Sequence, residues 1–207
     1  MRQTTTEQWL TELASEAPAP GGGAAAGMSA AMGAALVSMV CNLTIGKPKY
    51  AEHEDIAKEV LAEADKARDE GIRLAEEDAT AFSGVIAAYK MPKETDEEKQ
   101  ARTEAIQKGL VRAAETPLAV CRLSARVIKL SGLILDHSNP NVLSDVAVAA
   151  SNARSALESA ALNVDINLAS IKDFDERERL AGDLNDSLQA KVQAEAIIAA
   201  VSGRIRS

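Results

Sequence analysis

The feature that most limits the fold is a run from residue 24 to residue 45 without a single charged side chain. At about 22 residues, the run is long enough to cross a bilayer. It consists mainly of small residues, however, and polar side chains such as Ser29, Ser38 and Asn42 interrupt it. Small residues let a second helix backbone approach closely. We therefore expect a helix buried inside a bundle or a dimer interface, and no membrane partner.

The composition favours helices over sheets along the whole chain. The hydrophobic fraction is 46%, but aromatic residues make up only 2%, so most of the apolar content is Ala, Leu, Val and Ile. Ala is the strongest helix former, whereas strands are enriched in aromatic and β-branched residues. The sequence has no convincing alternating pattern and no internal repeat. We therefore predict an all-α fold.

Capping residues and helix breakers divide the chain into long helices. Thr4 or Thr5 can cap a short first helix, and the segment TDEE can form a capping box between Thr95 and Glu98. Further helices are expected over residues 24–45, 52–89, 96 to between 132 and 137, and 141–171, and a last helix opens at KDFDE. Pro117 should kink or briefly break the helix that starts at residue 96. Residues 1–207 are predicted to form one domain, a bundle of long helices with short connections.

The charge balance and the few Cys and His residues exclude several classes of function. The net charge is -8 and no basic stripe occurs, so we expect no nucleic-acid partner. The polar start of the chain shows no secretory signal, and Cys41 and Cys121 are expected to be buried, reduced thiols of a cytoplasmic protein. His53 and His137 are distant from these cysteines and from each other in the sequence. The spacing does not fit a zinc site, and no metal site is predicted.

Asp78 is the most informative single residue. On a helix it shares one face with small, apolar and aromatic residues at positions 71, 75, 82, 85 and 89. An ionised carboxylate on a buried face is costly unless it is paired or functional. Two interpretations stay open: a buried ion pair with Lys or Arg from another helix, and a general acid/base or counter-charge for a cation.

Asp145, Asn163 and Asn167 fall within one broad sector of the helix predicted over 141–171. Amide side chains on an Ala-rich face can hydrogen-bond a heterocycle that carries donors and acceptors. The alternative is a polar seam that fixes the register of packed helices. Asp145 would also lie in the first helical turn, where an acidic side chain complements the helix dipole.

Two further features could meet an anion or a carbonyl group. The glycines Gly21 to Gly23 stand at a helix start, where backbone N–H groups have no partner within the helix. Lysines flank prolines at two helix breaks and could steer an anionic ligand into a cleft: Lys47, Lys49, Lys90 and Lys93. In the alternative interpretation the three glycines form an ordinary loop, and each lysine is an ordinary surface residue.

Five segments occur in a fixed order along the chain: PAPGGGAAAGMSAAMGAALVSMVCNLTIGKPKY, EEDATAF, YKMPKETDEEKQAR, NPNVLSDVAVAA and ALNVDINLASIKD. In order and spacing they resemble the cyclodeaminase/cyclohydrolase family, over nearly the whole chain. The resemblance implies an all-helical homodimer with a folate site in a cleft near the glycine-rich loop. The catalytic aspartate of the family lies in a D-A-x-A-F segment, and the resemblance therefore implies that Asp78 is the catalytic residue here.

The resemblance implies hydrolysis of 5,10-methenyltetrahydrofolate to 10-formyltetrahydrofolate, with the folate as substrate and no metal or redox cofactor. Two alternatives are ring closure of a formimino folate with release of ammonia, and a helical interaction module without catalysis, in which Asp78 would be salt-bridged. The expected catalytic residues are Asp78 and Asp145. Aromatic residues would stack on the pterin and lysines would meet the glutamate tail, so the expected substrate-binding residues are Gly21, Gly22, Gly23, Lys47, Lys49, Tyr50, Phe82, Lys90, Asn141, Asn163 and Asn167.

Overall fold

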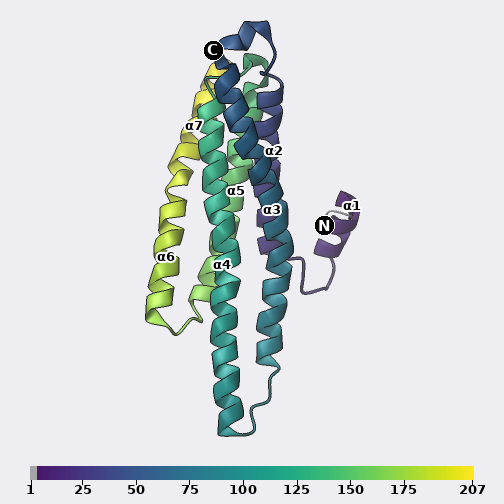
Figure 1. Cartoon of the computed structure of the whole chain (residues 1–207), viewed down its shortest axis with the longest axis vertical. Helices are drawn as coiled ribbons and strands as arrows, with labels where there is room; N and C mark the ends of the chain where they lie inside the picture. Colours follow the sequence, from purple (N-terminus) through teal and green to yellow (C-terminus); the bar gives the residue numbers. More distant parts are fainter. Residues whose placement is uncertain (1–3) are drawn as a thin grey trace.

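Figure 1 shows the computed structural model of the chain, which describes residues 4–207 apart from the side chains of Ala79 and Phe82. The helices are α1 (Thr6–Leu13), α2 (Gly22–Asn42), α3 (Glu54–Tyr89), α4 (Asp96–Ile134), α5 (Leu143–Leu168), α6 (Phe174–Leu188) and α7 (Ala190–Arg206). Two 3₁₀ turns, η1 (Pro48–His53) and η2 (Pro140–Val142), precede α3 and α5. The described residues contain no strand, so the predicted all-α class is confirmed.

The uncharged segment forms α2, which packs against α3, α4 and α5. Gly27 and Gly71 lie where the backbones of α2 and α3 approach each other. A Cβ on Gly71 would fall 2.9 Å from the carbonyl oxygen of Gly27. By length and composition α2 could cross a membrane, but 61% of its most apolar window is buried inside the bundle. Its small residues therefore serve close packing between helices, as expected.

One continuous hydrophobic cluster joins α2 to the helices around it. Fully buried side chains come from different helices, among them Val37 of α2, Leu118 of α4 and Leu157 of α5. Leu180 of α6 and Ile197 of α7 extend the same cluster. Each such side chain contributes about 1.5–3 kcal/mol when it is removed from water. This core fixes the relative positions of the helix ends that carry the polar residues discussed below.

The predicted caps are present in the structure. The hydroxyl of Thr5 accepts a hydrogen bond from the N–H of Gln8 at the start of α1. The backbone and side chains of Thr95 and Glu98 bond reciprocally at the start of α4, which is the expected capping box. The side chain of Asn139 likewise accepts from the N–H of Asn141 at the start of the turn η2. Local sequence chemistry therefore sets where these elements begin.

Two helix predictions differ in detail from the structure. Of the kink or short break expected at Pro117, the break is absent, because α4 continues through this residue. The predicted last helix is divided into α6 and α7 at Gln189, whose N–H bonds three residues back to Asp186 instead of four. The hydroxyl of Ser187 also bonds the carbonyl oxygen of Asp183, a contact that often bends helices. The tightened turn at this point separates the two helices.

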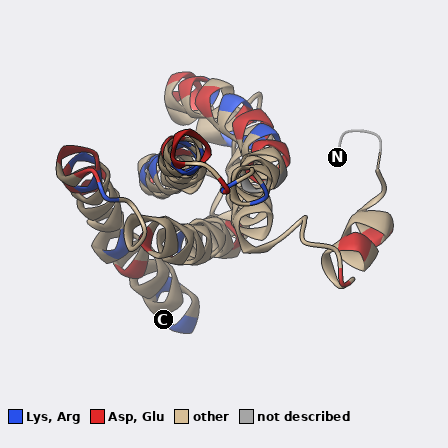
Figure 2. Cartoon of the chain, turned by 90° about the horizontal axis from the view of Figure 1, so that it is seen from below, with Lys and Arg blue, Asp and Glu red and all other residues tan. Residues whose placement is uncertain are grey.

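The first helix, α1, stands to one side of the bundle in Figures 1 and 2, on an irregular connection. Seen from below in Figure 2, acidic and basic residues are interspersed over the bundle helices. The side chain of Trp9 attaches α1, because it is 8% exposed and clusters with Ala24 of α2 and Ala75 of α3. It therefore packs next to the start of α2, where the glycine-rich segment enters the helix.

Candidate active site

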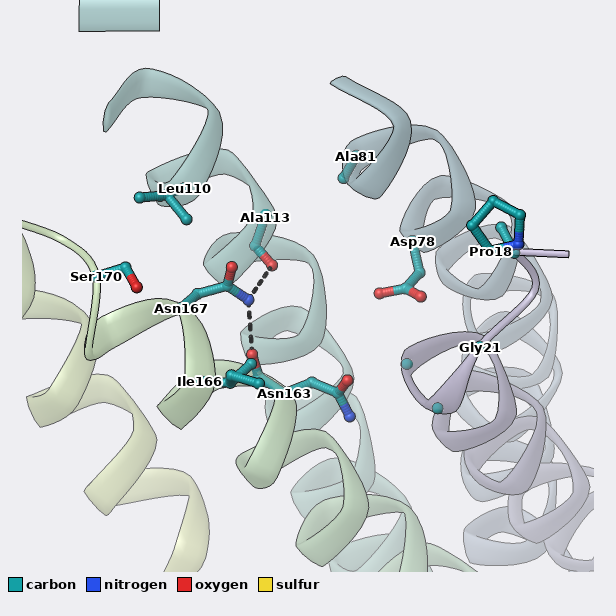
Figure 3. A pocket seen from close by; sticks show the side chains of 13 residues that line it. Pro18, Gly21, Asp78, Ala81, Leu110, Ala113, Asn163, Ile166, Asn167 and Ser170 are labelled. Atoms are coloured by element: carbon teal, nitrogen blue, oxygen red, sulfur yellow. Dashed lines mark hydrogen bonds between the residues drawn. The ribbon is translucent and has the colours of Figure 1, made fainter. Parts of the chain in front are cut away.

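A cavity of about 410 Å³ lies where the start of α2 meets α3, α4 and the end of α5. Figure 3 shows Asp78 on one side and Asn163, Asn167 and Ser170 across the cavity. The connection before α2, four helices and the connection after α5 supply the lining residues: Pro18, Ala19, Gly21, Gly22, Gly23, Asp78, Ala81, Leu110, Ala113, Asn163, Ile166, Asn167 and Ser170. The fold thus brings together the predicted glycines, Asp78 and the two asparagines.

The carboxylate of Asp78 lies directly against the backbone of Gly23. A Cβ on Gly23 would fall 2.1 Å from Oδ1 and 2.5 Å from Cγ of Asp78. The backbone N–H of Ala24 donates a hydrogen bond to the carboxylate. This N–H belongs to the first turn of α2, where backbone donors lack helical partners and the helix dipole is positive. Position 23 therefore requires glycine because a carboxylate approaches it closely.

Asp78 has no cationic partner in the described part of the chain. No ion pair joins it to a Lys or Arg among residues 4–207, and no charged neighbour contributes to its pKa shift. Burial raises the pKa of the Asp78 carboxyl above its ordinary value, and the hydrogen bond from Ala24 opposes this shift. The ion pair expected in that interpretation is therefore absent from the described residues. A partly buried, unpaired carboxylate with a raised pKa is the arrangement expected of a general acid/base.

Asn163 and Asn167 direct acceptors into the cavity. The Nδ2 group of Asn163 donates to the carbonyl oxygen of Ser159 at 2.8 Å. The Nδ2 group of Asn167 donates to the carbonyl oxygens of Asn163 at 2.7 Å and of Ala113 at 3.3 Å. Both N–H bonds of the Asn167 amide are thus used, which leaves its Oδ1 as an acceptor. The bond to Ala113 also links α5 to α4, as expected of a polar contact that fixes helix register, and the ligand-binding role of the two amides stays a prediction.

Several predicted residues gather at the opposite end of α2, outside this cavity. The hydroxyl of Tyr50 donates to Oδ1 of Asn139 at 2.9 Å, and the Lys49 ammonium lies 5.5 Å from the Tyr50 ring centroid. Because α2 has 21 residues, the two ends are about 30 Å apart at 1.5 Å per residue. Within one chain the structure therefore does not bring the following residues to Asp78: Lys47, Lys49, Tyr50, Asn141 and Asp145.

Two other predicted residues belong to α3 or its end. Lys90 is the C-cap residue of α3, about 18 Å along the helix from Asp78 at 1.5 Å per residue, and it does not line the cavity. Phe82 belongs to α3, but its side chain lies outside the described part of the chain. Its predicted stacking role therefore stays a prediction.

Some lining residues were not predicted. Leu110 and Ala113 of α4 look like ordinary core positions in the sequence, and nothing there connects them with Asp78. Ile166 lies between the two asparagines on α5 and is 72% exposed at the cavity rim. Extending the Asn163–Asn167 sector by one neighbouring position would have found it.

The remaining candidate nucleophiles and ligands are not in the cavity. Burial raises the pKa of both Cys41 and Cys121 to about 12, so neither forms a thiolate near neutral pH. Although distant in sequence, His53 and His137 meet at the far end of the bundle, with their Nδ1 atoms 3.4 Å apart. The described residues contain no group of three or more His, Cys, Asp or Glu side chains arranged to hold a metal ion.

Comparisons with known proteins agree with the fold. The formiminotransferase-cyclodeaminase family model matches residues 5–186. A methenyltetrahydrofolate cyclohydrolase of Methylorubrum extorquens is 50% identical over 169 residues, which cover 82% of this chain and 81% of that protein. The formimidoyltransferase-cyclodeaminase of Rattus norvegicus is 32% identical over 95% of this chain, which spans only 36% of that longer protein. A solved formiminotetrahydrofolate cyclodeaminase from Thermotoga maritima superposes with a TM-score of 0.85 and 27% identity, covering 98% of this chain and 96% of that one.

Proposed function

This chain belongs to the formiminotransferase-cyclodeaminase family, and on that premise we propose that it is a methenyltetrahydrofolate cyclohydrolase. It would hydrolyse 5,10-methenyltetrahydrofolate to 10-formyltetrahydrofolate, reversibly. One observation carries the proposal: the unpaired carboxylate of Asp78 faces a cavity whose opposite wall offers amide oxygen acceptors. The methenyl substrate is a cation, and its pterin carries N–H donors, so both features suit it. The likeness to the Methylorubrum extorquens cyclohydrolase supports the same choice.

In this reaction Asp78 would act first as a counter-charge and then as a general base and acid. A water molecule attacks the bridging carbon, its oxygen forms the new C–O bond, and one of its protons passes to the Asp78 carboxylate. Asp78 then returns a proton to N5 as the C–N5 bond breaks. The hydroxyl proton leaves to solvent as the formyl C=O forms on N10. One water is consumed and one proton is released overall.

The start of α2 and the asparagine wall would support these steps. The helix has no side-chain cap, so the N–H groups of Gly22 and Gly23 are available to the oxygen that gains charge on the bridging carbon. The acceptors of Asn163 and Asn167 would hold the pterin's N–H groups and fix the ring relative to Asp78. Such fixed groups need no rearrangement during the reaction, which is the basis of electrostatic catalysis.

The experiment that tests this function gives the purified protein two substrates. We expect rapid loss of the methenyl absorbance with 5,10-methenyltetrahydrofolate, and little ammonia from 5-formiminotetrahydrofolate. Both rates are measured under one set of conditions, with heat-denatured protein as the control. If ammonia release were faster than methenyl hydrolysis, the protein would be a cyclodeaminase instead. If neither reaction exceeded the control, the enzymatic proposal would be wrong.

We also propose that the protein is a homodimer joined through the outward faces of α2 and α5. No charged residue occurs in α2, which packs beside α5. Met32 and Met39 of α2 are 50% and 37% exposed, and Leu162 and Ile166 of α5 are 71% and 72% exposed. These exposed apolar side chains lie on the two neighbouring helices, and Ile166 also lines the cavity. Exposed apolar patches of this kind mark interaction sites, and a twofold dimer covers the same patch on both copies.

Sedimentation equilibrium tests the dimer. The expected mass is twice that of the 21.8 kDa chain, and the double variant Met32→Glu/Leu162→Glu should sediment as a monomer because its charges would be buried in the interface. Val192→Glu is the matched control, since Val192 is 71% exposed on α7, outside this surface. A monomeric mass for the unmodified protein at micromolar concentration would contradict the proposal.

A further inference from the structure

A second depression adjoins the cavity and is lined by residues of α4, the end of α3, the connection from α5 to α6 and the start of α6. Figure 1 shows the α3–α4 hairpin and the α5–α6 connection toward the lower end of the bundle. It shares two lining residues, Leu110 and Ser170, with the cavity. Three cationic side chains line it, Arg102, Lys172 and Arg177, and no Asp or Glu does. We refer to it as the cationic groove.

The three cations of the groove lie in a protein that is acidic overall. The chain has a net charge of -8, and many of its arginines have a carboxylate partner: Arg68, Arg73, Arg122, Arg126, Arg154, Arg179 and Arg204. Within the described part of the chain, Arg102, Lys172 and Arg177 form no ion pair. Asp173 follows Lys172 directly, but its carboxylate accepts the N–H of Glu176 as the cap of α6. No described acidic side chain therefore lies within ion-pair distance of these three cations, and none lines the groove.

Hydrogen bonds fix the walls of the groove. The Arg102 side chain donates through Nε and Nη2 to the carbonyl oxygen of Tyr89, at 3.3 and 3.1 Å. The side chain of Gln107 ties α4 to the α5–α6 connection, since its Nε2 donates to the carbonyl oxygen of Ser170 at 3.2 Å and its Oε1 accepts the N–H of Lys172 at 2.8 Å. The Arg177 guanidinium lies over the Phe174 ring, 5.5 Å from its centroid. Held in this way, the guanidinium groups of Arg102 and Arg177 lose less freedom when a ligand binds.

We propose that the cationic groove binds the carboxylates of the glutamyl tail of the folate substrate, an inference that rests on the proposed function. In Figure 3, Leu110 and Ser170 lie across the cavity from Asp78. A folate with its reactive ring at Asp78 would therefore leave the cavity past these two residues and enter the groove. Each added glutamate brings a further carboxylate, and guanidinium groups recognise carboxylates with paired hydrogen bonds. The groove thus takes the role predicted for Lys47, Lys49 and Lys90.

The test compares 5-formyltetrahydrofolate with one and with three glutamates, a stable folate whose binding needs no turnover. Calorimetric titration should show tighter binding of the triglutamate to the unmodified protein. In the double variant Lys172→Gln/Arg177→Gln the triglutamate affinity should fall about tenfold, and the monoglutamate affinity less, because charge-assisted contacts are lost. With methenyl triglutamate, KM should rise by a similar factor while kcat is unchanged. Added salt should weaken the preference of the unmodified protein.

Lys129→Gln/Arg206→Gln is the matched control. It removes one exposed Lys and one exposed Arg from positions that do not line the groove, and it should retain the triglutamate preference. Equal affinity of the unmodified protein for the two folates, or an unchanged preference in the groove variant, would overturn the proposal. Normal methenyl hydrolysis without any tail preference would contradict the proposed role of the groove but leave the proposed function intact. Tail-dependent binding without hydrolysis would support the role of the groove and contradict the proposed function.

Discussion

Replacement of Asp78 by Asn is expected to lower kcat for methenyl hydrolysis by about 10² to 10⁴, the usual contribution of a positioned general acid/base. The amide has nearly the same shape and can still accept the N–H of Ala24. It cannot take a proton from water, and it carries no charge to balance the cationic ring. Stopped-flow measurement of the methenyl absorbance checks the rate. The dimer should survive, because Asp78 lies inside the cavity.

The matched control for this variant is Asp69→Asn on the same helix. The Asp69 side chain is 58% exposed and pairs only with the neighbouring Arg68, so kcat should stay within about twofold of the unmodified enzyme, given how little surface pairs contribute. Near-normal turnover of Asp78→Asn would show that Asp78 is not the general acid/base of the reaction. Equal losses in both variants would point to a general effect of charge on the helix.

The same Asp78→Asn variant should be more stable near neutral pH. Because burial raises the folded-state pKa of Asp78, its contribution to stability is fully present below the unfolded value of 3.8 and is lost as the pH rises through the folded value. Above that point the unmodified protein holds a desolvated charge, which the neutral amide of the variant lacks. Urea unfolding at pH 7 and at pH 4 should therefore show a larger stability gain of Asp78→Asn at pH 7. A gain that does not depend on pH would contradict this account.

The second large effect is expected from Gly23→Ala. The new methyl group would overlap the Asp78 carboxylate, with only 2.1 Å to Oδ1, so the carboxylate must move or the start of α2 must shift. A displacement of about 1 Å at a reacting group can cost on the order of 10² in rate. We expect a loss of kcat of this size with the fold retained. The methenyl assay and far-ultraviolet circular dichroism measure the two properties.

Gly182→Ala adds the same methyl group to the interior of α6, where nothing lies within 4 Å. It should leave kcat unchanged and raise the free energy of unfolding by up to about 1 kcal/mol, since Ala is the better helix former. Full activity of Gly23→Ala would show that the carboxylate can relocate without consequence. In that case the contact between position 23 and Asp78 would be packing alone.

Local periodicity was sufficient to find part of the site. The helical spacing around Asp78 identified a carboxylate on an apolar face, and the four-residue spacing of Asn163 and Asn167 identified the opposite wall. Both predictions depend only on side chains within two turns of one helix, which a repeat of 3.6 residues determines. The glycines were recognised from their position at a helix start, although the sequence did not indicate which of them needs to be glycine.

Distances along the bundle could not be predicted in the same way. Tyr50 and Asp145 belong to segments that carry the family resemblance, yet long antiparallel helices place them at the end opposite Asp78. The cationic groove is the converse case, because Arg102 and Lys172 are far apart in sequence and each resembles an ordinary surface residue. Only the packing of α4 against the α5–α6 connection brings them together. Such juxtapositions depend on helix lengths and crossings, which local patterns do not encode.

The contact between Gly23 and Asp78 also restricts how this protein can change during evolution. The Asp78 carboxylate occupies the space that any side chain at position 23 would need. A larger residue at 23 becomes acceptable only after position 78 has lost its carboxylate, and with it the proposed catalytic group. The two positions should therefore mutate as a coupled pair, with a strong dependence of each substitution on the other. Descendants that abandon the chemistry would be free to fill position 23, and a side chain there would mark a relative that has changed its function.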